Sequence, residues 1–366
     1  MKIKNEKKVQ LIILAICFAI FGILLLLANQ SRSNEVDHGD LYYGRGRVVD
    51  VVYESTNPSF LYQTLAVEML GGAFHGVTAV AQNNLMDHTL RAFSEGDRVI
   101  VEMSHYANRI ISPDRGNFLI FFVALFLILL CVIGGKRGIL SVAGLLFSLV
   151  AIVFILVPLT LAGYPSILMA ILIGTLITVV SITLLAGVNA KSLSAIFGCI
   201  SGVVIAACFA LIAGHLAFIS GYHTEHAGIL LAWGSSDMSL SGIFISGVII
   251  SAMGAITDTS MTIASAMEEI KLANPTMKTA KLARAGLNVG RDAMGTMSNT
   301  LILAFVGSSF SLILLIFSTN TTWVQFINND GIGIEIIQGI AGSIGIILTV
   351  PITTFIAAKL FTVAND

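Results

Sequence analysis

Residues 117–133 read NFLIFFVALFLILLCVI, a run without one charged side chain. Its length approaches the ~20 apolar residues that an α-helix needs to cross the hydrocarbon core of a membrane, because each residue rises ~1.5 Å. The rest of the chain has the same character, since 56% of its 366 residues are hydrophobic and 11% are charged. Soluble domains carry roughly 25% charged residues. The sequence therefore predicts an integral membrane protein.

Hydropathy predicts further runs of this kind on both sides of residues 117–133. The eight predicted spans cover residues 9–28, 117–133, 139–160, 165–186, 193–218, 240–262, 296–318 and 334–358. The first run is longer than the apolar core of a signal peptide and is followed by no small-x-small cleavage site, which favours an uncleaved anchor. We expect an α-helical polytopic protein with a tail and anchor at residues 1–28 and a seven-helix domain at 117–366.

The distribution of positive charge predicts the orientation. Most of the 20 Lys and Arg residues lie in the N-terminal tail and in alternate loops, whereas the short loops around Gly163, Tyr222 and Asn328 contain none. Because basic residues in short loops favour the cytoplasmic side, we expect both termini in the cytoplasm and residues 29–116 outside it.

Residues 29–116 change in composition from long apolar runs to short alternating ones. The predicted strands are residues 46–53, 64–69, 76–81 and 98–103, separated by turn sequences such as Asn57-Pro58 and Glu95-Gly96-Asp97. This pattern predicts a small exported all-β domain between the first two spans, either an OB-like barrel or a sandwich.

A basic cytoplasmic loop is predicted at residues 263–295. Within it, Asn274-Pro275 is followed by apolar residues at a helical period, including Met277 and Leu287. Two interpretations remain open: a short amphipathic helix at the inner leaflet with its lysines toward anionic headgroups, or a plain positively charged loop.

Asp258 is the clearest charged residue inside a predicted span. Such a charge costs ~2.5 to 3.5 kcal/mol on insertion scales, so it indicates a functional site. It lies about 18 residues, or ~27 Å, from Leu240 at the outer end, which places it near the cytoplasmic mouth. We expect a polar, small-residue stripe to share its helix face and to face a protein interior or a wet cavity. The stripe comprises Ser251, Gly254, Asp258, Thr262 and Ser265.

A second polar segment, residues 290–300 (GRDAMGTMSNT), opens the next span at the same side of the membrane. The predicted polar site comprises Asp258, Thr262, Arg291, Asp292, Thr296, Asn299 and Thr300. In a functional interpretation, Asp258 takes a cation or a proton. In a structural one, Asp258 bonds to Asn299 or pairs with Arg291 and so holds two helices together.

Other kinds of chemistry find no support in the sequence. The four cysteines all fall in apolar runs, at spacings that fit neither a disulfide framework nor a zinc site. There is no nucleotide-binding loop or G-x-S-x-G motif, and a net charge of −1 offers no field for nucleic acid. We therefore expect no catalytic residue, metal, cofactor or nucleic-acid partner, and no enzyme. Glu335 is expected to cap a helix N-terminus at the outer face.

Residues 254–265 (GAITDTSMTIAS) and 290–304 (GRDAMGTMSNTLILA) resemble the YibE/F family of bacterial membrane proteins. The resemblance extends over most of the chain, including a Gly-Asp-x-Val pattern at residues 96–99, while Thr259 and Ser260 stand where more apolar residues are expected. It implies a bacterial cell membrane location and the same motif positions at Asp258 and in residues 291–300. It implies no chemistry, because the family looks to be of unestablished function and is often described only as membrane or transport proteins.

We expect a membrane permease or transporter component for a small solute or ion, with its polar site near the cytoplasmic mouth. The alternative is a non-transporting envelope scaffold or receptor whose exported β domain recruits a partner. The expected partners are the lipid bilayer, an unknown small solute or ion, and a paralogous membrane subunit or a second copy of the chain. The outer halves of the spans offer mostly Ser, Thr and Gly, which weighs against a continuous polar path.

Overall fold

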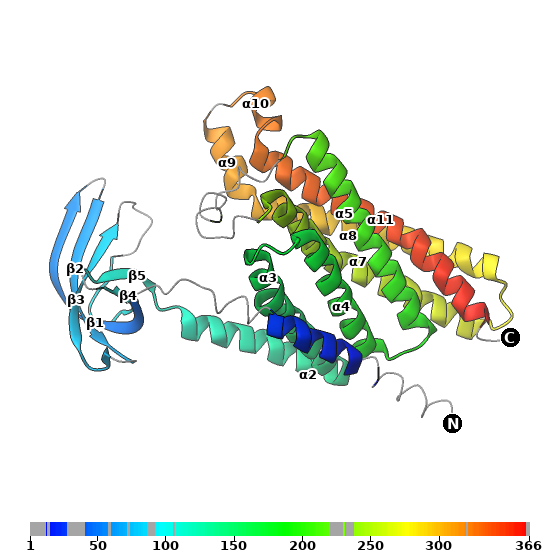
Figure 1. Cartoon of the computed structure of the whole chain (residues 1–366), viewed down its shortest axis with the longest axis horizontal. Helices are drawn as coiled ribbons and strands as arrows, with labels where there is room; N and C mark the ends of the chain where they lie inside the picture. Colours follow the sequence, from blue (N-terminus) through cyan, green and yellow to red (C-terminus); the bar gives the residue numbers. More distant parts are fainter. Residues whose placement is uncertain are drawn as a thin grey trace. The chain divides into compact units, whose positions relative to one another are not determined.

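The computed structural model describes residues 12, 15–27, 41–57, 60–71, 74–85, 92–104, 107–219, 230, 238–319 and 321–363. The chain divides into two compact units (Figure 1). One comprises Met1–Asn34 with Gly134–Asp366, and the other comprises Glu35–Ile133.

The smaller unit contains a closed five-stranded barrel with the strand order β1-β2-β3-β5-β4. Its strands are β1 (Tyr42–Asn57), β2 (Phe60–Met69), β3 (Thr78–Leu85), β4 (Arg98–Met103) and β5 (Arg109–Pro113). Neighbouring strands are antiparallel except β3 and β5, which pair in parallel. The predicted small barrel is confirmed and the sandwich alternative is wrong. The sequence had indicated only the first four strands.

Side chains alternate along the barrel strands as a half-buried strand requires. On β2, Leu65, Val67 and Met69 point into a core that Val48 and Val99 complete. The buried amide of Gln63 is satisfied within this core, because its Oε1 accepts from Phe93 N at 3.0 Å and its Nε2 donates to Phe93 O at 3.1 Å. The barrel therefore has a core of its own.

Helices form most of the remaining described chain. In chain order they are α2 (Gly116–Ala151), the π-helical η2 (Ile152–Leu156), α3 (Val157–Leu161), α4 (Ser166–Ala186), α5 (Ala190–Leu216), α7 (Leu240–Ala273), α8 (Thr279–Ser308), α9 (Phe310–Ser318), α10 (Trp323–Ile327) and α11 (Asp330–Val363). A short apolar helix, Ala15–Leu27, precedes the barrel in the chain. Its Phe21 ring packs 5.0 Å from the ring of Phe147 on α2.

Among the described residues, five helices are long and apolar enough to cross a membrane: Gly116–Leu161, Ser166–Ala186, Ala190–Leu216, Leu240–Ala273 and Asp330–Thr362. The pair α8 and α9 also passes the same test as one span bent by 54°, which gives six. The eight spans predicted from the sequence differ from this count in two ways. They divide Gly116–Leu161 into two spans near Gly135, whose φ of 55° and ψ of −133° are not helical. They also count the shorter helix Ala15–Leu27 as a span. The architecture is that of a multispan membrane protein, and the number eight stays a prediction.

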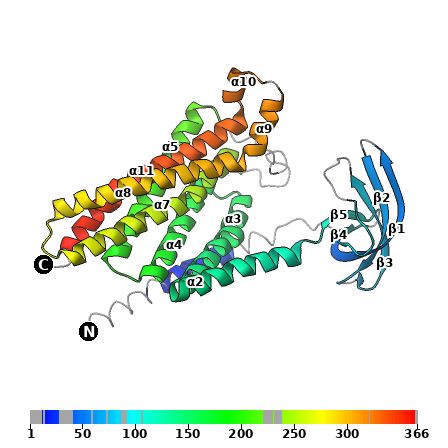
Figure 2. The ribbon, with the colours of Figure 1, turned by 180° about the vertical axis from the view of Figure 1, so that it is seen from behind.

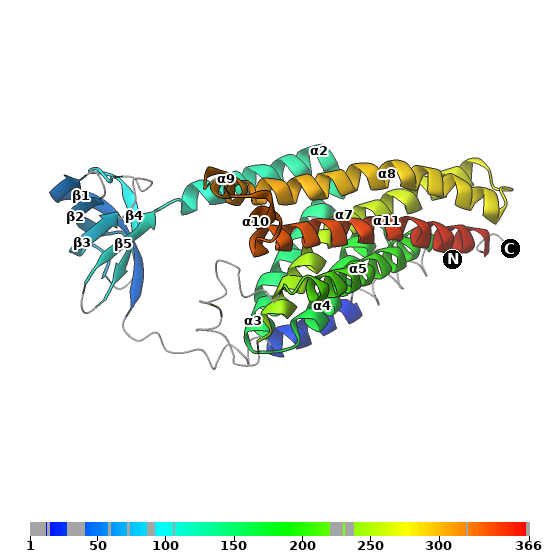
Figure 3. The same cartoon turned by 90° about the horizontal axis from the view of Figure 1, so that it is seen from above.

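Helices α5, α7, α8 and α11 lie side by side, and α4 packs on α5 and α7 (Figures 2 and 3). Glycines bring α5 very close to α11, since a Cβ at Gly198 would overlap Thr353 and a Cβ at Gly202 would overlap Thr349. Close approach through small residues is the usual way in which membrane helices associate. The large side chains Ile249 and Ile256 of α7 are fully buried in the resulting core.

The segment expected as a basic loop, residues 263–295, is largely helical. Helix α7 continues to Ala273, and α8 begins at Thr279 after a tight turn. Lys271 closes this turn by donating to the carbonyls of Pro275 at 2.8 Å and Met277 at 3.1 Å. The first half of α8 packs inward through Leu282, so the structure has no separate amphipathic helix here.

Candidate functional site

Helix α8 is held against α7 and α11 by two glycines on its inner face. A Cβ at Gly286 would overlap Met267 of α7, and a Cβ at Gly290 would overlap Val350 of α11. Because a Cβ at either position would displace a packed side chain, these two glycines mark the face of α8 that turns toward the bundle. The opposite face of α8 therefore turns outward.

The two predicted halves of the polar site, on α7 and on α8, lie at the same height along the bundle, and we call this height one layer of the bundle. At one level Gly290 of α8 faces Ile263 of α7, and at another Leu301 of α8 and Ala252 of α7 both face Gly342 of α11. Asp258 lies between these levels on α7, and residues 291–300 lie between them on α8. The structure thus places Asp258 at the height of the second motif.

All of the predicted site residues lie on the outward surface of this layer. Asp258, Thr262, Arg291, Asp292, Thr296, Asn299 and Thr300 are exposed. Gly254, one turn before Asp258, has nothing within 4 Å of where a Cβ would stand. The chain by itself therefore does not enclose the polar stripe in a protein interior or a cavity.

The polar side chains of the site make few hydrogen bonds. The hydroxyls of Thr296 and Thr300 donate to carbonyls of their own helix, and Arg291 Nη1 lies 3.5 Å from Asn288 Oδ1. Within the part of the chain that the structure describes, the side chains of Asp258, Asp292 and Asn299 make no hydrogen bond or ion pair. The structural interpretation, in which Asp258 bonds to Asn299 or pairs with Arg291, is therefore not seen.

A buried polar contact that sequence reasoning missed lies next to Asp258. Cys199 Sγ of α5 is 3.1 Å from Thr257 Oγ1 of α7 and 3.5 Å from Thr178 Oγ1 of α4. These atoms join three helices inside the core. The cysteine lies in an apolar run, where free Cys ordinarily behaves as a small hydrophobe, so only the helix packing reveals its partners.

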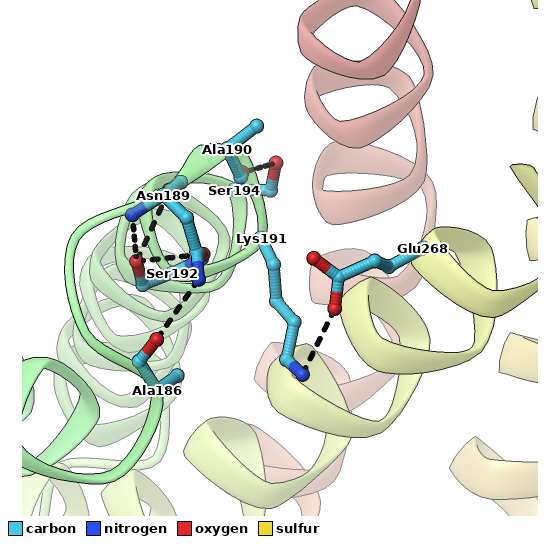
Figure 4. A network of polar contacts seen from close by, with 7 residues as sticks. All are labelled: Ala186, Asn189, Ala190, Lys191, Ser192, Ser194 and Glu268. Atoms are coloured by element: carbon cyan, nitrogen blue, oxygen red, sulfur yellow. Dashed lines mark hydrogen bonds and ion pairs between the residues drawn. The ribbon is translucent and has the colours of Figure 1, made fainter. Parts of the chain in front are cut away.

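An ion pair ties α7 to the start of α5 near the α7–α8 turn (Figure 4). Lys191 Nζ lies 3.1 Å from Glu268 Oε2. The start of α5 is fixed by a reciprocal cap, in which Ser192 N donates to Asn189 Oδ1 at 2.8 Å and Asn189 N donates to Ser192 Oγ at 2.9 Å. The side chain of Lys191 therefore extends from a helix end whose backbone is held by these two hydrogen bonds.

A cavity of about 390 Å³ opens on the same helix face as Arg291, between α8 and α11. Its polar lining comes from Arg284, Asn288 and Arg291, and Phe355 of α11 forms part of its apolar lining. The three polar residues are spaced by four and then three positions, and this spacing in the sequence indicates that they share one face of a helix. Two guanidinium groups make this cavity suited to anions.

Glu335 was expected to cap a helix N-terminus, and the structure corrects this. Helix α11 begins at Asp330, so Glu335 lies beyond its first turn and Asp330 is the acid placed there. Glu335 Oε2 is instead buried and has no hydrogen-bond partner within the described residues. Among those residues, no group of three or more His, Cys, Asp or Glu side chains is placed to hold a metal ion.

The comparison with known families extends over both polar segments. The family model of the YibE/F-like proteins matches residues 122–363. The chain belongs to the YibE/F-like family. This confirms the resemblance drawn from residues 254–265 and 290–304, and the match runs from residue 122 within α2 to the end of α11, while the barrel lies outside it. No match was found among curated proteins or among solved structures.

Proposed function

We propose that this YibE/F-like protein is a membrane permease or transporter component for a small solute or ion. The main observation in support is that Asp258, Asp292 and Asn299 lie in one layer of the helical unit and face outward. Within the described chain their side chains have no hydrogen-bond or ion-pair partner. A charge in hydrocarbon costs ~2.5 to 3.5 kcal/mol on insertion scales. Such a face is stable only beside water or beside another protein chain.

The depth of this face supports a site near one membrane surface. About 20 helical residues cross the hydrocarbon core, so a span that begins at Leu240 is nearly complete at Asp258. The first turns of α8 then lie beyond the core, where Lys281 and Arg284 meet water or anionic headgroups. In the proposed orientation this side is the cytoplasm of a bacterial cell, and the barrel lies outside the cell membrane.

In this proposal Asp258 takes a cation or a proton, and the hydroxyl of Thr262 and the amide of Asn299 provide neighbouring oxygens. A second chain, either another copy or a paralogous subunit, covers the outward faces of α7 and α8 and closes a polar path between them. Arg291 and Asp292 are adjacent on α8, so the faces of two copies offer each other both signs of charge. Transport would be coupled, if at all, to an ion gradient.

Reconstituted transport tests the proposal. The purified protein in proteoliposomes is screened for uptake and efflux of ions and small metabolites, and the active substrate is then assayed with Asp258→Asn. We expect transport to fall at least about tenfold, because the amide cannot carry the cation or proton. Glu269→Gln, an exposed acid farther along α7, is the matched control and should transport normally. Normal transport by correctly inserted Asp258→Asn would refute this assignment of the site.

The scaffold or receptor function remains a second candidate because of the barrel surface. Val49, Val52 and Tyr53 of β1 are each about half exposed, with fractions of 48%, 57% and 56%. Exposed apolar side chains of this kind are available for contact with a partner protein.

The two candidates predict opposite results for two variants. A scaffold should keep its cellular role in Asp258→Ala and lose it when residues 46–103 are deleted. A permease whose site is on α7 and α8 should lose transport in Asp258→Ala. A deletion strain complemented with each variant, and scored for solute accumulation and for envelope integrity, distinguishes them.

A further inference from the structure

A second pocket lies at the end of the bundle opposite the α7–α8 turn, where α8 bends by 54° into α9. Its volume is about 360 Å³, and it is lined by α8, α9, α10 and the first turns of α11. Figure 1 shows these elements meeting at that end of the helical unit. A pocket of this size can hold a small organic molecule.

The lining is apolar except for two side chains, Ser309 at the bend and Glu335 on α11. Aromatic rings of Phe305 and Phe326 and several isoleucines supply the rest of the wall. A pocket with apolar walls and a few convergent polar groups is the usual form of a small-molecule site.

Both polar groups lack partners. Ser309 is only 7% exposed, and neither its Oγ nor Glu335 Oε2 has a hydrogen-bond partner within the described residues. A buried oxygen left without a donor is strongly unfavourable, and most such groups in proteins are paired. The pocket therefore lacks a hydrogen-bond donor that would suit a carboxylate.

The polar groups in the pocket restrict which kind of ligand can supply the missing hydrogen-bond donor. One carboxylate and one hydroxyl are too few oxygens for Ca²⁺ or Mg²⁺, which take six or more ligands with water included. A lone water would find two polar partners in otherwise apolar surroundings, which is the lower limit for an ordered buried water. A positively charged N–H donor with an apolar body fits all of the lining.

We propose that this pocket binds a primary ammonium group carried on an apolar chain. The ammonium donates to Glu335 Oε2 and Ser309 Oγ, and its charge is opposite to that of the carboxylate. The rings of Phe305 and Phe326 contact the apolar chain and attract the cation through their faces. Ile336 and Ile340 are 44% and 52% exposed, so the chain extends past them into hydrocarbon. This binding does not depend on transport at Asp258.

Two sources share this chemistry, a free alkylamine and the ethanolamine headgroup of a phospholipid. Trp323 provides a built-in reporter for either, because its ring stacks 5.4 Å from the ring of Phe326 in the pocket wall. The sequence contains one other tryptophan, Trp233. A Trp233→Phe background therefore leaves Trp323 as the sole tryptophan.

The experiment titrates octylammonium and octanol into this protein in phosphatidylcholine nanodiscs and follows the fluorescence of Trp323. We expect saturable binding of octylammonium, at least about tenfold tighter than that of octanol. Glu335→Gln should lose about tenfold in octylammonium affinity with octanol unchanged, while the remote control Glu269→Gln binds both like the parent. Equal affinity for both ligands in the parent protein, or unchanged octylammonium binding by Glu335→Gln, would overturn the proposal.

Ser309→Ala keeps the proposal testable if Glu335→Gln does not fold. Removing this hydroxyl should weaken octylammonium binding several-fold and leave octanol binding unchanged, and equal weakening of both ligands would count against the proposal. Nanodiscs that contain phosphatidylethanolamine identify the source. A rightward shift of the octylammonium titration in these discs assigns the lipid headgroup, and an unshifted titration assigns a free amine.

Discussion

Cys199 Sγ lies 3.1 Å from Thr257 Oγ1, and this contact between α5 and α7 determines where the next side chain points. Successive residues in a helix are turned by about 100°, so Asp258 is directed away from α5 once Thr257 is directed toward it. Thr257 also donates to Met253 O at 2.7 Å, which fixes its hydroxyl on the helix. Core packing therefore orients Asp258 without any direct partner for its carboxylate.

This contact predicts an effect on stability. Cys199→Ala removes the sulfur from a buried site and leaves Thr257 and Thr178 without it, so we expect a loss of about 1 to 3 kcal/mol in the free energy of unfolding. Cys208→Ala, at an exposed cysteine on the same helix, should change it by less than about 0.5 kcal/mol. Denaturation in detergent followed by circular dichroism measures both, and equal effects would contradict the predicted role of Cys199.

The glycine contact between α8 and α11 predicts different effects on stability for two similar substitutions. Gly290→Ala places a Cβ against Val350 and should destabilise the protein by about 1 to 3 kcal/mol. Gly307→Ala adds a methyl where nothing lies within 4 Å. It should leave stability unchanged or raise it by up to about 1 kcal/mol, because alanine has less backbone freedom to lose on folding. Thermal unfolding of the two variants side by side tests this difference.

The ion pair of Lys191 and Glu268 should contribute little. Both side chains are partly exposed, at 22% and 30%, so solvent screens their attraction. We expect Glu268→Gln to cost less than about 1 kcal/mol, with the difference shrinking as salt is raised. Glu269→Gln, which removes the next carboxylate without breaking this pair, is the control. A salt-independent loss in Glu268→Gln would mean that the glutamate acts through something other than this pair.

The outward face of α8 predicts a contact between chains if a second copy covers it. In a background without the four native cysteines, Asn299→Cys should be joined to a second copy by a short bifunctional thiol reagent in native membranes. Met294→Cys, whose side chain packs against the chain's own core, should not be joined. Electrophoresis without reducing agent reads both results. Absence of any product from Asn299→Cys, with normal expression, would favour a different covering partner such as a paralogous subunit.

The barrel offers a prediction on pH. Tyr43 Oη donates to Glu102 Oε2 at 2.8 Å, and this hydrogen bond to the carboxylate raises the pKa of Tyr43 above its usual value. Because the folded state then holds the phenol proton more tightly than the unfolded chain, this contribution to stability is present at neutral pH and is lost as the pH rises through the raised pKa. In Glu102→Gln the pKa of Tyr43 should fall toward its usual value, as ultraviolet difference titration against Tyr43→Phe would show.

The periodicity of the sequence was sufficient to predict much of the fold. Alternation of side chains indicated the first four barrel strands, because a half-buried strand repeats every two residues. It missed β5 (Arg109–Pro113), whose five residues include only two consecutive isoleucines and whose pairing with β3 joins Gln82 to Arg109 in a distant part of the chain. Hydropathy likewise ended one span at Thr262 although α7 continues to Ala273, since backbone hydrogen bonding does not stop where apolar composition does.

For the candidate site, the sequence spacing predicted which residues share a helix face, and it did not predict the direction of that face. Spacing of three and four residues shows that Asp258 and Thr262 share a helix face, but it does not show what that face meets. The direction depends on contacts between residues far apart in the sequence, such as Cys199 with Thr257 for α7 and Gly290 with Val350 for α8. Glu335 was misjudged for a related reason, because its pocket exists only where α8 bends beside α11.

The strand pairing of the barrel also bears on how a partner can recognise it. Strand β1 pairs with β2 along most of its length but with β4 only at Tyr42–Arg47, so within the described residues the second edge of residues 50–57 is not paired with another strand. Proteins that recruit extended peptides by strand addition need an open sheet edge, and this part of β1 offers one although the sheet closes into a barrel at its other end. A partner strand added there would lie beside the exposed side chains of Val52 and Tyr53. Substitution of these surface residues, with the strands left intact, can then change partner choice without unfolding the barrel.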